Sequence, residues 1–153
     1  EILIQMDGLV QSSSQDKLVF VLAATNLPWE LDMALMRRLE KRILVPLPDL
    51  ETRSTLLENL FDRYVVHEDF GAIAAQTEGF SGADIKMLCK ECAMRPLRRV
   101  LKEIDSSTNA SENVTLGPIL KQDVAGALES TKPSAQMLGQ KYEEFNRQFG
   151  QNI

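Results

Sequence analysis

Asn26 is the first side chain whose type and position indicate chemistry. It follows residues 18–24, an uninterrupted apolar run of strand length. Such a run predicts a strand covered on both faces, as in a parallel α/β sheet, and open sheets of this kind bind ligands beyond the carboxyl ends of their strands. An amide at that edge can donate to a phosphate oxygen and accept from a water. An Asx turn before Pro28 is the alternative interpretation.

Arg37 and Arg38 are adjacent arginines in a basic stretch that also contains Lys41 and Arg42. Guanidinium groups stay charged and can bind phosphate oxygens in a bidentate manner. Two neighbouring arginines therefore suit a phosphate-binding role. A solvated helix face held by salt bridges is the alternative interpretation.

Gly82 and Ala83 open a predicted helix just after Ser81, which is a favourable capping residue. Small residues at a helix N-terminus allow a ligand to approach the backbone closely, and the positive end of the helix dipole favours phosphate. A helix that is only capped, without ligand contact, is the alternative interpretation.

The elements that must position the first two candidate sites lie in the first part of the chain. Residues 31–39 have a helical composition, with Asp32 in the first turn. Residues 42–45 predict a second short strand, ended by Pro46. The order strand, helix, strand predicts the end of an α/β layer structure over residues 1–48.

The chain becomes helical after residue 48. Pro96 predicts a kink or a break in the longest helical stretch. We expect a helical bundle over residues 49–130 and a C-terminal helix within residues 131–153, so the fold class is α/β followed by all-α. Capping residues and apolar spacing predict helices over residues 49–60, 70–76, 82–104, 122–128 and 135–149.

Cys89 and Cys92 have the C-x-x-C spacing of some redox and zinc sites. They lie inside the longest predicted helix, whereas a redox pair usually sits at a helix N-terminus, where the thiolate is stabilised. The chain has no second pair, and its only histidine is His67. We therefore expect two reduced thiols on a helix, and no metal site.

The composition is that of an ordinary globular protein, with 44% apolar and 25% charged residues. A formal net charge of −5 argues against nucleic acid as a partner. No apolar run is long enough to cross a bilayer, so no membrane association is expected. The chain opens on Glu1 in what reads as a helix, which suggests a piece of a longer protein.

Three segments together resemble the AAA+ ATPase family: residues 21–28, 31–43 and 78–85. The resemblance implies that Asn26 is the sensor 1 residue, which orients a water against the γ-phosphate. It implies that Arg37 and Arg38 are arginine fingers that reach the ATP of a neighbouring subunit. It also implies that Gly82 and Ala83 begin the lid helix and pack beside the nucleotide. Many relatives have three consecutive arginines, which leaves open which of the two is the principal finger.

The phosphate-binding loop G-x-x-x-x-G-K-[ST] is absent from the sequence, as is a strand ending in the Asp-Glu pair that holds magnesium. The resemblance implies ATP and Mg²⁺ as cofactors of an intact protein. We expect the chain alone to bind nucleotide poorly and not to hydrolyse ATP.

Within the family, the chain is similar to the microtubule-severing clade. Leu39 is typical of katanins, where Vps4 and spastin relatives have Phe, and residues 132–135 are also katanin-like. The resemblance implies a hexamer of identical or related AAA subunits that acts on tubulin in microtubules, in the cytoplasm and at the cytoskeleton. The alternatives are a Vps4-like ATPase that disassembles membrane-associated polymers, and a non-catalytic oligomerisation or interaction fragment.

Overall fold

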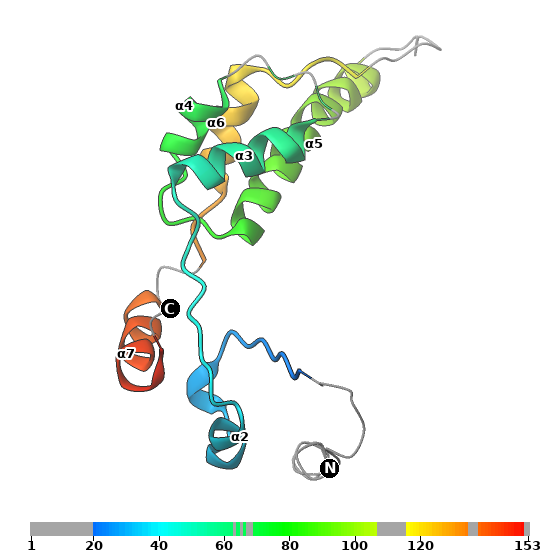
Figure 1. The fold of residues 1–153 in the computed structure, drawn as a ribbon. Helices are drawn as coiled ribbons and strands as arrows, with labels where there is room; N and C mark the ends of the chain where they lie inside the picture. The colour runs from blue at the N-terminus through cyan, green and yellow to red at the C-terminus, as the bar shows by residue number, and fades with distance from the viewer. Residues whose placement is uncertain are drawn as a thin grey trace. The chain divides into compact units, whose positions relative to one another are not determined.

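The computed structural model describes residues 20–62, 64, 66, 69–106, 116–134 and 138–151. His67, residues 18–19 of the predicted strand and the predicted start of the last helix at residues 135–137 lie outside these ranges. Within them the helices, labelled in Figure 1, are η1 (Pro28–Glu30), α2 (Met33–Arg38), α3 (Leu50–Phe61), α4 (Phe70–Ala75), α5 (Gly82–Ser106), α6 (Lys121–Ser130) and α7 (Gly139–Phe149).

The described residues divide into two compact units. The helical bundle contains residues 46–134 and holds α3 to α6. The split unit contains residues 20–45 together with 138–151, and therefore joins η1 and α2 to the C-terminal helix α7.

Side-chain caps fix where the bundle helices begin. The Asp49 carboxylate accepts a hydrogen bond from the Thr52 N–H at 2.8 Å, and that of Asp69 accepts one from the Gly71 N–H at 3.3 Å. These bonds satisfy N–H groups that have no partner within the helix. Gly79 follows α4 with a φ of 78°, a left-handed conformation that glycine adopts at little cost. The predicted starts of α3 and α4 are confirmed.

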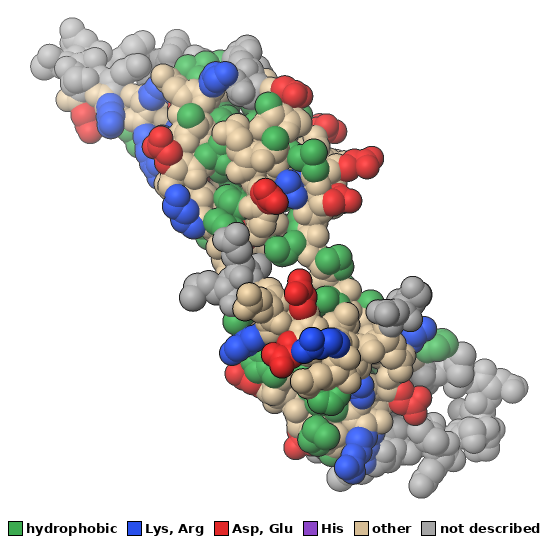
Figure 2. All heavy atoms as spheres, turned by 90° about the vertical axis from the view of Figure 1, so that its left-hand side faces the viewer, with side chains coloured by type: hydrophobic (Ala, Val, Ile, Leu, Met, Phe, Trp, Pro, Cys, Tyr) green, Lys and Arg blue, Asp and Glu red, His purple; other side chains and the backbone are tan. Residues whose placement is uncertain are grey.

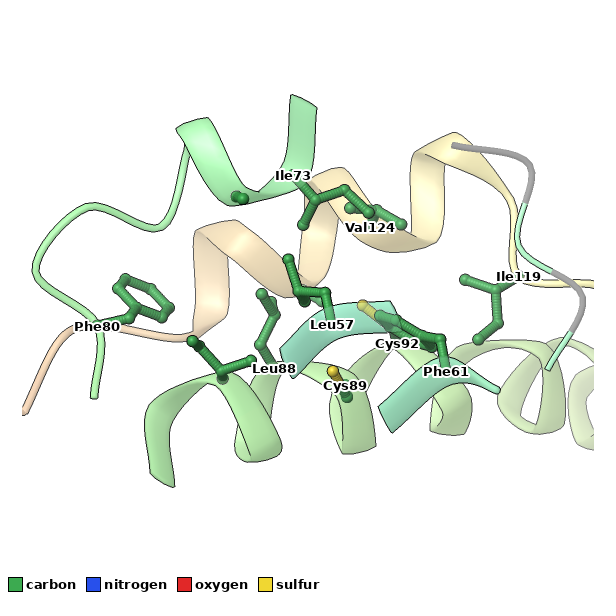
Figure 3. Packing of buried hydrophobic residues seen from close by; sticks show 12 residues of the cluster. Leu57, Phe61, Ile73, Phe80, Leu88, Cys89, Cys92, Ile119 and Val124 are labelled. Carbon is green, nitrogen blue, oxygen red and sulfur yellow. The ribbon is translucent and has the colours of Figure 1, made fainter. Parts of the chain in front are cut away.

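The core of the bundle lies where α3 packs between α5 and α4, with α6 alongside α5. Figure 3 shows Leu57 and Phe61 of α3 among the buried side chains of α4, α5 and α6, with Val124 contributed by α6. Burying each large apolar side chain contributes about 1.5–3 kcal/mol, so this cluster stabilises the bundle. The cluster consists of Leu57, Phe61, Ile73, Ala74, Phe80, Ile85, Leu88, Cys89, Cys92, Ile119, Val124 and Ala127.

Pro96 lies inside α5, which continues as one helix from Gly82 to Ser106. Of the two predicted alternatives at Pro96, a kink or a break, the break is wrong, and the single long helix predicted over residues 82–104 is confirmed. A proline in a helix interior removes one N–H donor and costs about 3 kcal/mol. Leu88 and Cys92 of the same helix are almost fully buried against the bundle core, and this burial offsets the cost.

Arg53 is a buried charged residue, 7% exposed, on α3. Its guanidinium donates to the Ala74 carbonyl, from Nε at 3.3 Å and from Nη2 at 3.2 Å, and to the Pro48 carbonyl at 2.9 Å. The Thr77 hydroxyl also donates to the Ala74 carbonyl, at 2.9 Å. Arg53 thus ties α3 to the C-terminal end of α4, where carbonyls lack partners within the helix.

Neither predicted strand forms a β-ladder among the described residues. Residues 20–24 and 42–45 are not in regular secondary structure, and the only β pairing in the described ranges is a parallel bridge between Val66 and Ile119. The apolar run is exposed rather than buried on both faces: Leu22 is 97% exposed and Val45 is 83% exposed. A strand needs neighbours to pair its N–H and C=O groups, and the described residues supply none.

Charges of both signs lie on the surface of both units. Figure 2 shows one face, on which acidic and basic side chains are interspersed with hydrophobic ones. Among the described residues no helix is long and apolar enough to cross a membrane.

Candidate functional site

Asn26 lies at a bend directly before η1 and is exposed. The hydroxyl of Thr25, rather than the Asn26 side chain, accepts from the Leu27 N–H at 3.1 Å and closes this turn. The side-chain amide of Asn26 makes no hydrogen bond to another described residue. The alternative of an Asx turn before Pro28 is therefore not found. Its side chain is left available for a ligand or a water.

The backbone of Asn26 is held by the C-terminal helix. The Tyr142 hydroxyl of α7 donates to the Asn26 carbonyl at 2.5 Å. The Tyr142 ring also lies 5.2 Å from that of Trp29, and the Lys141 ammonium sits 5.5 Å above the Trp29 ring. Aromatic and cation–π contacts of this kind each stabilise by about 0.5–1.5 kcal/mol. No local pattern predicts this contact, because the two hydrogen-bonded residues lie 116 positions apart in the sequence.

The arginine pair lies in the last turn of α2. Asp32 begins this helix by accepting from the Ala34 N–H at 2.6 Å, and Met36 is buried. Arg37 is exposed and makes no hydrogen bond or ion pair to another described residue. Arg38 is half-buried and donates to the Ala34 carbonyl at 3.1 Å. The two arginines therefore differ: the Arg37 side chain is exposed without a described partner, and the Arg38 side chain donates to its own helix.

Arg42 has a structural role that its sequence context does not suggest. Its guanidinium donates to the Met36 carbonyl at 2.7 Å and to the Phe149 carbonyl at 2.9 Å. These carbonyls lie in the last turns of α2 and α7, where a cation complements the negative end of the helix dipole. Gln151 adds two bonds nearby, from its N–H to the Arg42 carbonyl and from its side chain to the Glu40 carbonyl, each 3.1 Å long.

Gly82 and Ala83 are exposed in the first turn of α5. The turn is ordered by Asp84, whose carboxylate accepts from the Ser81 N–H at 2.9 Å, the Ser81 hydroxyl at 2.8 Å and the Ser134 N–H at 3.2 Å. A methyl group added at Gly82 would meet no described atom within 4 Å, so the space beside this turn is open. The predicted capped start of α5 is confirmed.

The pKa of Asp84 is set by opposing effects. Burial of the carboxyl acts to raise its pKa, but the hydrogen bonds from Ser81 and Ser134 outweigh burial and lower the pKa below its ordinary value. The carboxylate therefore stays ionised at neutral pH and favours the positive N-terminal end of α5.

Cys89 and Cys92 are free, buried thiols in the bundle core. Burial raises the pKa of each to about 12, so both stay protonated at neutral pH. No group of side chains among the described residues could hold a metal ion. Both cysteines lie on α5, the long helix on which they were expected.

The candidate residues fall into two groups. Asn26 and the pair Arg37 and Arg38 belong to the split unit, whereas Gly82 and Ala83 belong to the helical bundle. Sequence reasoning proposed these five, but it missed three residues that tie the surrounding elements together, Tyr142, Arg42 and Arg53, because each donates a hydrogen bond to a carbonyl distant in the sequence.

Two family models match the chain, and each contains one of these groups. The model for the ATPase family associated with various cellular activities (AAA) matches residues 1–47, and the model for the AAA+ lid domain matches residues 67–110. The chain belongs to the AAA ATPase family. The predicted fold class, the end of a AAA+ α/β subdomain followed by a helical lid, is confirmed.

Within that family the chain is similar to the katanins. It is 41% identical over 160 residues to the katanin p60 A-like 2 protein of Xenopus tropicalis, with 97% of this chain and 29% of that protein covered. It is 44% identical over 140 residues to Meiotic spindle formation protein mei-1 of Caenorhabditis elegans, with 88% of this chain and 29% of that protein covered. The chain thus spans less than a third of the length of these relatives.

Solved structures are similar in fold. The FIGL-1 AAA domain has a TM-score of 0.79 at 32% identity, and the match covers 97% of this chain and 49% of that one. A structure described as "Structural Basis for Katanin Self-Assembly" has a TM-score of 0.75 at 37% identity, and the match covers 93% of this chain and 50% of that one. Because the solved chains are about twice as long, they contain parts of the fold that have no counterpart here.

Proposed function

We propose that this chain forms the C-terminal part of a katanin-like AAA ATPase module, whose complete form couples ATP hydrolysis to microtubule severing. Relatives named katanin, spastin and meiotic spindle formation protein support this assignment. The observation that carries it is the exposure of two apolar segments, residues 20–24 and 43–45, on either side of Asn26 and α2. Neighbouring strands of a larger sheet would cover these segments and position the residues between them.

Asn26 acts on the nucleotide of its own subunit in this proposal. Its amide is exposed and unused by other described residues, so it can donate to a γ-phosphate oxygen or hold the attacking water. The reaction is mostly a matter of positioning and charge stabilisation, which suits a neutral hydrogen-bonding group.

Arg37 is the principal arginine finger in this proposal, and Arg38 supports it. Arg37 is exposed without a described partner, whereas Arg38 already donates to the carbonyl of Ala34. A guanidinium that reaches the ATP of a neighbouring subunit can raise the rate by about 10³–10⁵. The role requires assembly, and we propose a hexamer of identical or related AAA subunits; one solved relative is described in terms of katanin self-assembly.

ATP would supply the phosphoryl group that is transferred to water, and a bound Mg²⁺ would neutralise negative charge on its phosphates. Gly82 and Ala83 fit a contact with the nucleotide, because the first turn of α5 is exposed and open beside Gly82. One solved relative is a FIGL-1 AAA domain in complex with ADP. The phosphate-binding loop and the magnesium-binding acidic pair would come from residues outside this sequence, so we expect no ATPase activity from the chain alone.

We further propose that residues 1–48 complete the large α/β subdomain, that residues 49–130 act as the lid, and that residues 131–153 contribute the C-terminal helix. Tubulin in microtubules is the proposed substrate and the cytoskeleton the proposed location, since the relatives include a meiotic spindle protein.

A chimera tests this function. The part of the Xenopus tropicalis relative that precedes its match to Glu1 is joined to this chain, and ATP turnover and loss of immobilised fluorescent microtubules are measured. We expect both activities in the chimera and neither in the chain alone. Asn26→Ala should lower turnover by about 10²-fold or more, as for loss of a single transition-state hydrogen-bond donor elsewhere.

Three outcomes would contradict the proposal. Turnover by the chain alone would refute the need for the upstream part. Normal turnover in the Asn26→Ala chimera would refute the sensor role. A chimera that hydrolyses ATP but leaves microtubules intact would argue for another polymer as substrate, including the membrane-associated polymers that Vps4-like enzymes disassemble.

A further inference from the structure

We propose that α7 is a brace that fixes the position of Asn26 relative to α2. Tyr142 and Arg42 are the positioning residues, one at each of the two attachments of α7. This inference rests on the proposed function for its consequence in catalysis, but the brace itself is defined by contacts within the split unit.

The first attachment is between Tyr142 and the backbone of Asn26. The Tyr142 hydroxyl donates to the Asn26 carbonyl at 2.5 Å, while its ring packs against Trp29 at a centroid distance of 5.2 Å. A bond to the carbonyl fixes the peptide plane that follows Asn26, and therefore restricts the direction in which the Asn26 side chain leaves the backbone. The amide itself stays free of other described residues.

The second attachment is between the end of α7 and the end of α2. The Arg42 guanidinium donates to Phe149 and to Met36, whose carbonyls are 2.9 and 2.7 Å away. Met36 directly precedes the arginine pair, so this bond is made to the same helical turn. The backbone N–H of Gln151 closes the contact by donating to the Arg42 carbonyl at 3.1 Å.

The two attachments lie seven residues apart on α7, which corresponds to roughly 10 Å along the helix axis. A helix is stiff over that length, because each of its turns is hydrogen-bonded to the next. A displacement of Asn26 relative to α2 must therefore break one attachment or bend α7. In the proposed ATPase, the sensor that acts on a subunit's own ATP and the finger that acts on a neighbour's ATP would be linked through one helix.

The chain offers a matched pair of variants for a test. Tyr142→Phe removes the hydroxyl but keeps the ring against Trp29. Tyr64→Phe is the control: Tyr64 is the only other tyrosine, lies in the bundle unit, and contacts Phe61 through its ring. Trp29 is the only tryptophan and lies at the first attachment, so its fluorescence reports on that contact in the complete chain.

The first measurement is the emission of Trp29 in the complete chain. We expect Tyr142→Phe to shift it to longer wavelength, because the hydroxyl that holds α7 beside Trp29 is lost, and Tyr64→Phe to leave it unchanged. Unchanged emission in Tyr142→Phe would overturn the attachment. This result does not depend on whether the protein hydrolyses ATP.

The second measurement is ATP turnover by the chimera. We expect Tyr142→Phe to lower kcat by about two- to tenfold, the range for loss of one hydrogen bond, with the KM for ATP unchanged. An unaltered kcat in Tyr142→Phe, when Asn26→Ala is impaired, would overturn the positioning role and leave the proposed function intact. Normal turnover in Asn26→Ala would instead refute the sensor role itself.

A double-mutant cycle separates a brace from two unrelated contacts. Arg42→Lys keeps the charge but loses the fork that reaches both carbonyls. If α7 is a brace, releasing either attachment frees the helix. The kcat of the combined Tyr142→Phe, Arg42→Lys variant then falls by a smaller factor than the product of the two factors measured for the single variants. Multiplicative losses would show that the two contacts act independently and would overturn the brace.

Discussion

The helical bundle and the split unit differ in how completely each buries its own apolar side chains. In the bundle, Leu57 is 0% exposed and α3 and α4 begin at side-chain caps. In the split unit, Leu22 is 97% exposed and the apolar segments find no strand partner among the described residues. This chain therefore carries a buried core in its helical bundle, whereas the apolar segments beside Asn26 and α2 stay exposed among the described residues.

The largest effect is expected at Arg37, the proposed principal finger in the split unit. In the chimera, Arg37→Ala should lower ATP turnover by about 10³-fold, because a finger guanidinium stabilises the charge of the transition state. The free energy of unfolding of the chain should change by less than about 0.5 kcal/mol, since Arg37 is exposed. Turnover is measured by phosphate release, and unfolding by circular dichroism in urea. Turnover within twofold of the parent chimera would remove Arg37 from the finger role.

The second prediction compares the same substitution in both units. Leu57→Ala removes a fully buried side chain and should lower the free energy of unfolding by about 2–5 kcal/mol. Leu22→Ala should change it by less than about 0.5 kcal/mol, because this side chain is already in solvent. Urea unfolding of both variants gives the two values. Equal losses of unfolding free energy in the two variants would mean that residues 20–24 are buried in solution. The two units would then not differ in how they bury their apolar side chains.

The third and smallest effect concerns the cap of α5. Asp84→Asn should cost about 0.5–2 kcal/mol at pH 7, because the ionised carboxylate caps the helix. The folded-state pKa of Asp84 is lowered, so its stabilisation is present above the ordinary value of 3.8 and is lost as the pH falls through the folded value. Urea unfolding at neutral and at acidic pH measures this. The difference in free energy of unfolding between the parent chain and Asp84→Asn should shrink as the pH falls from neutral to strongly acidic values.

Asp105→Asn is the matched control for this cap, because Asp105 is an exposed aspartate in the last turn of the same helix. We expect it to change stability by less than about 0.5 kcal/mol at either pH. An Asp84→Asn cost that is independent of pH, or equal to that of Asp105→Asn, would contradict the electrostatic account of the cap.

The helices were predictable because their signals are local. An acidic or hydroxyl residue placed just before an apolar repeat predicted the starts of α3 and α5 at Asp49 and Ser81, whereas the cap of α4 at Asp69 was not predicted. The helix break considered at Pro96 does not occur, since the local cost of a proline is outweighed by burial of the same helix against the bundle. Local rules therefore fail where tertiary packing is strong.

The strands were predicted from the same kind of local pattern, but a strand is completed only by its neighbours. Residues 20–24 have the composition of a buried strand and yet are exposed, because none of the described residues pairs with them. The candidate residues Asn26, Arg37 and Arg38 were recognised from motif and residue type. Their supports, Tyr142 and Arg42, were not recognised, since hydrogen bonds to carbonyls more than 100 residues away leave no pattern in the sequence.

The dependence of the split unit on missing neighbours can be measured by hydrogen exchange with mass spectrometry, in the chain alone and in the chimera. In the chain alone, we expect amides of α3 and the buried part of α5 to be protected and those of residues 20–24 and 43–45 to exchange freely. In the chimera, both segments should become protected while α3 and α5 change little. Protection of residues 20–24 in the chain alone, or free exchange of both segments in the chimera, would contradict this dependence.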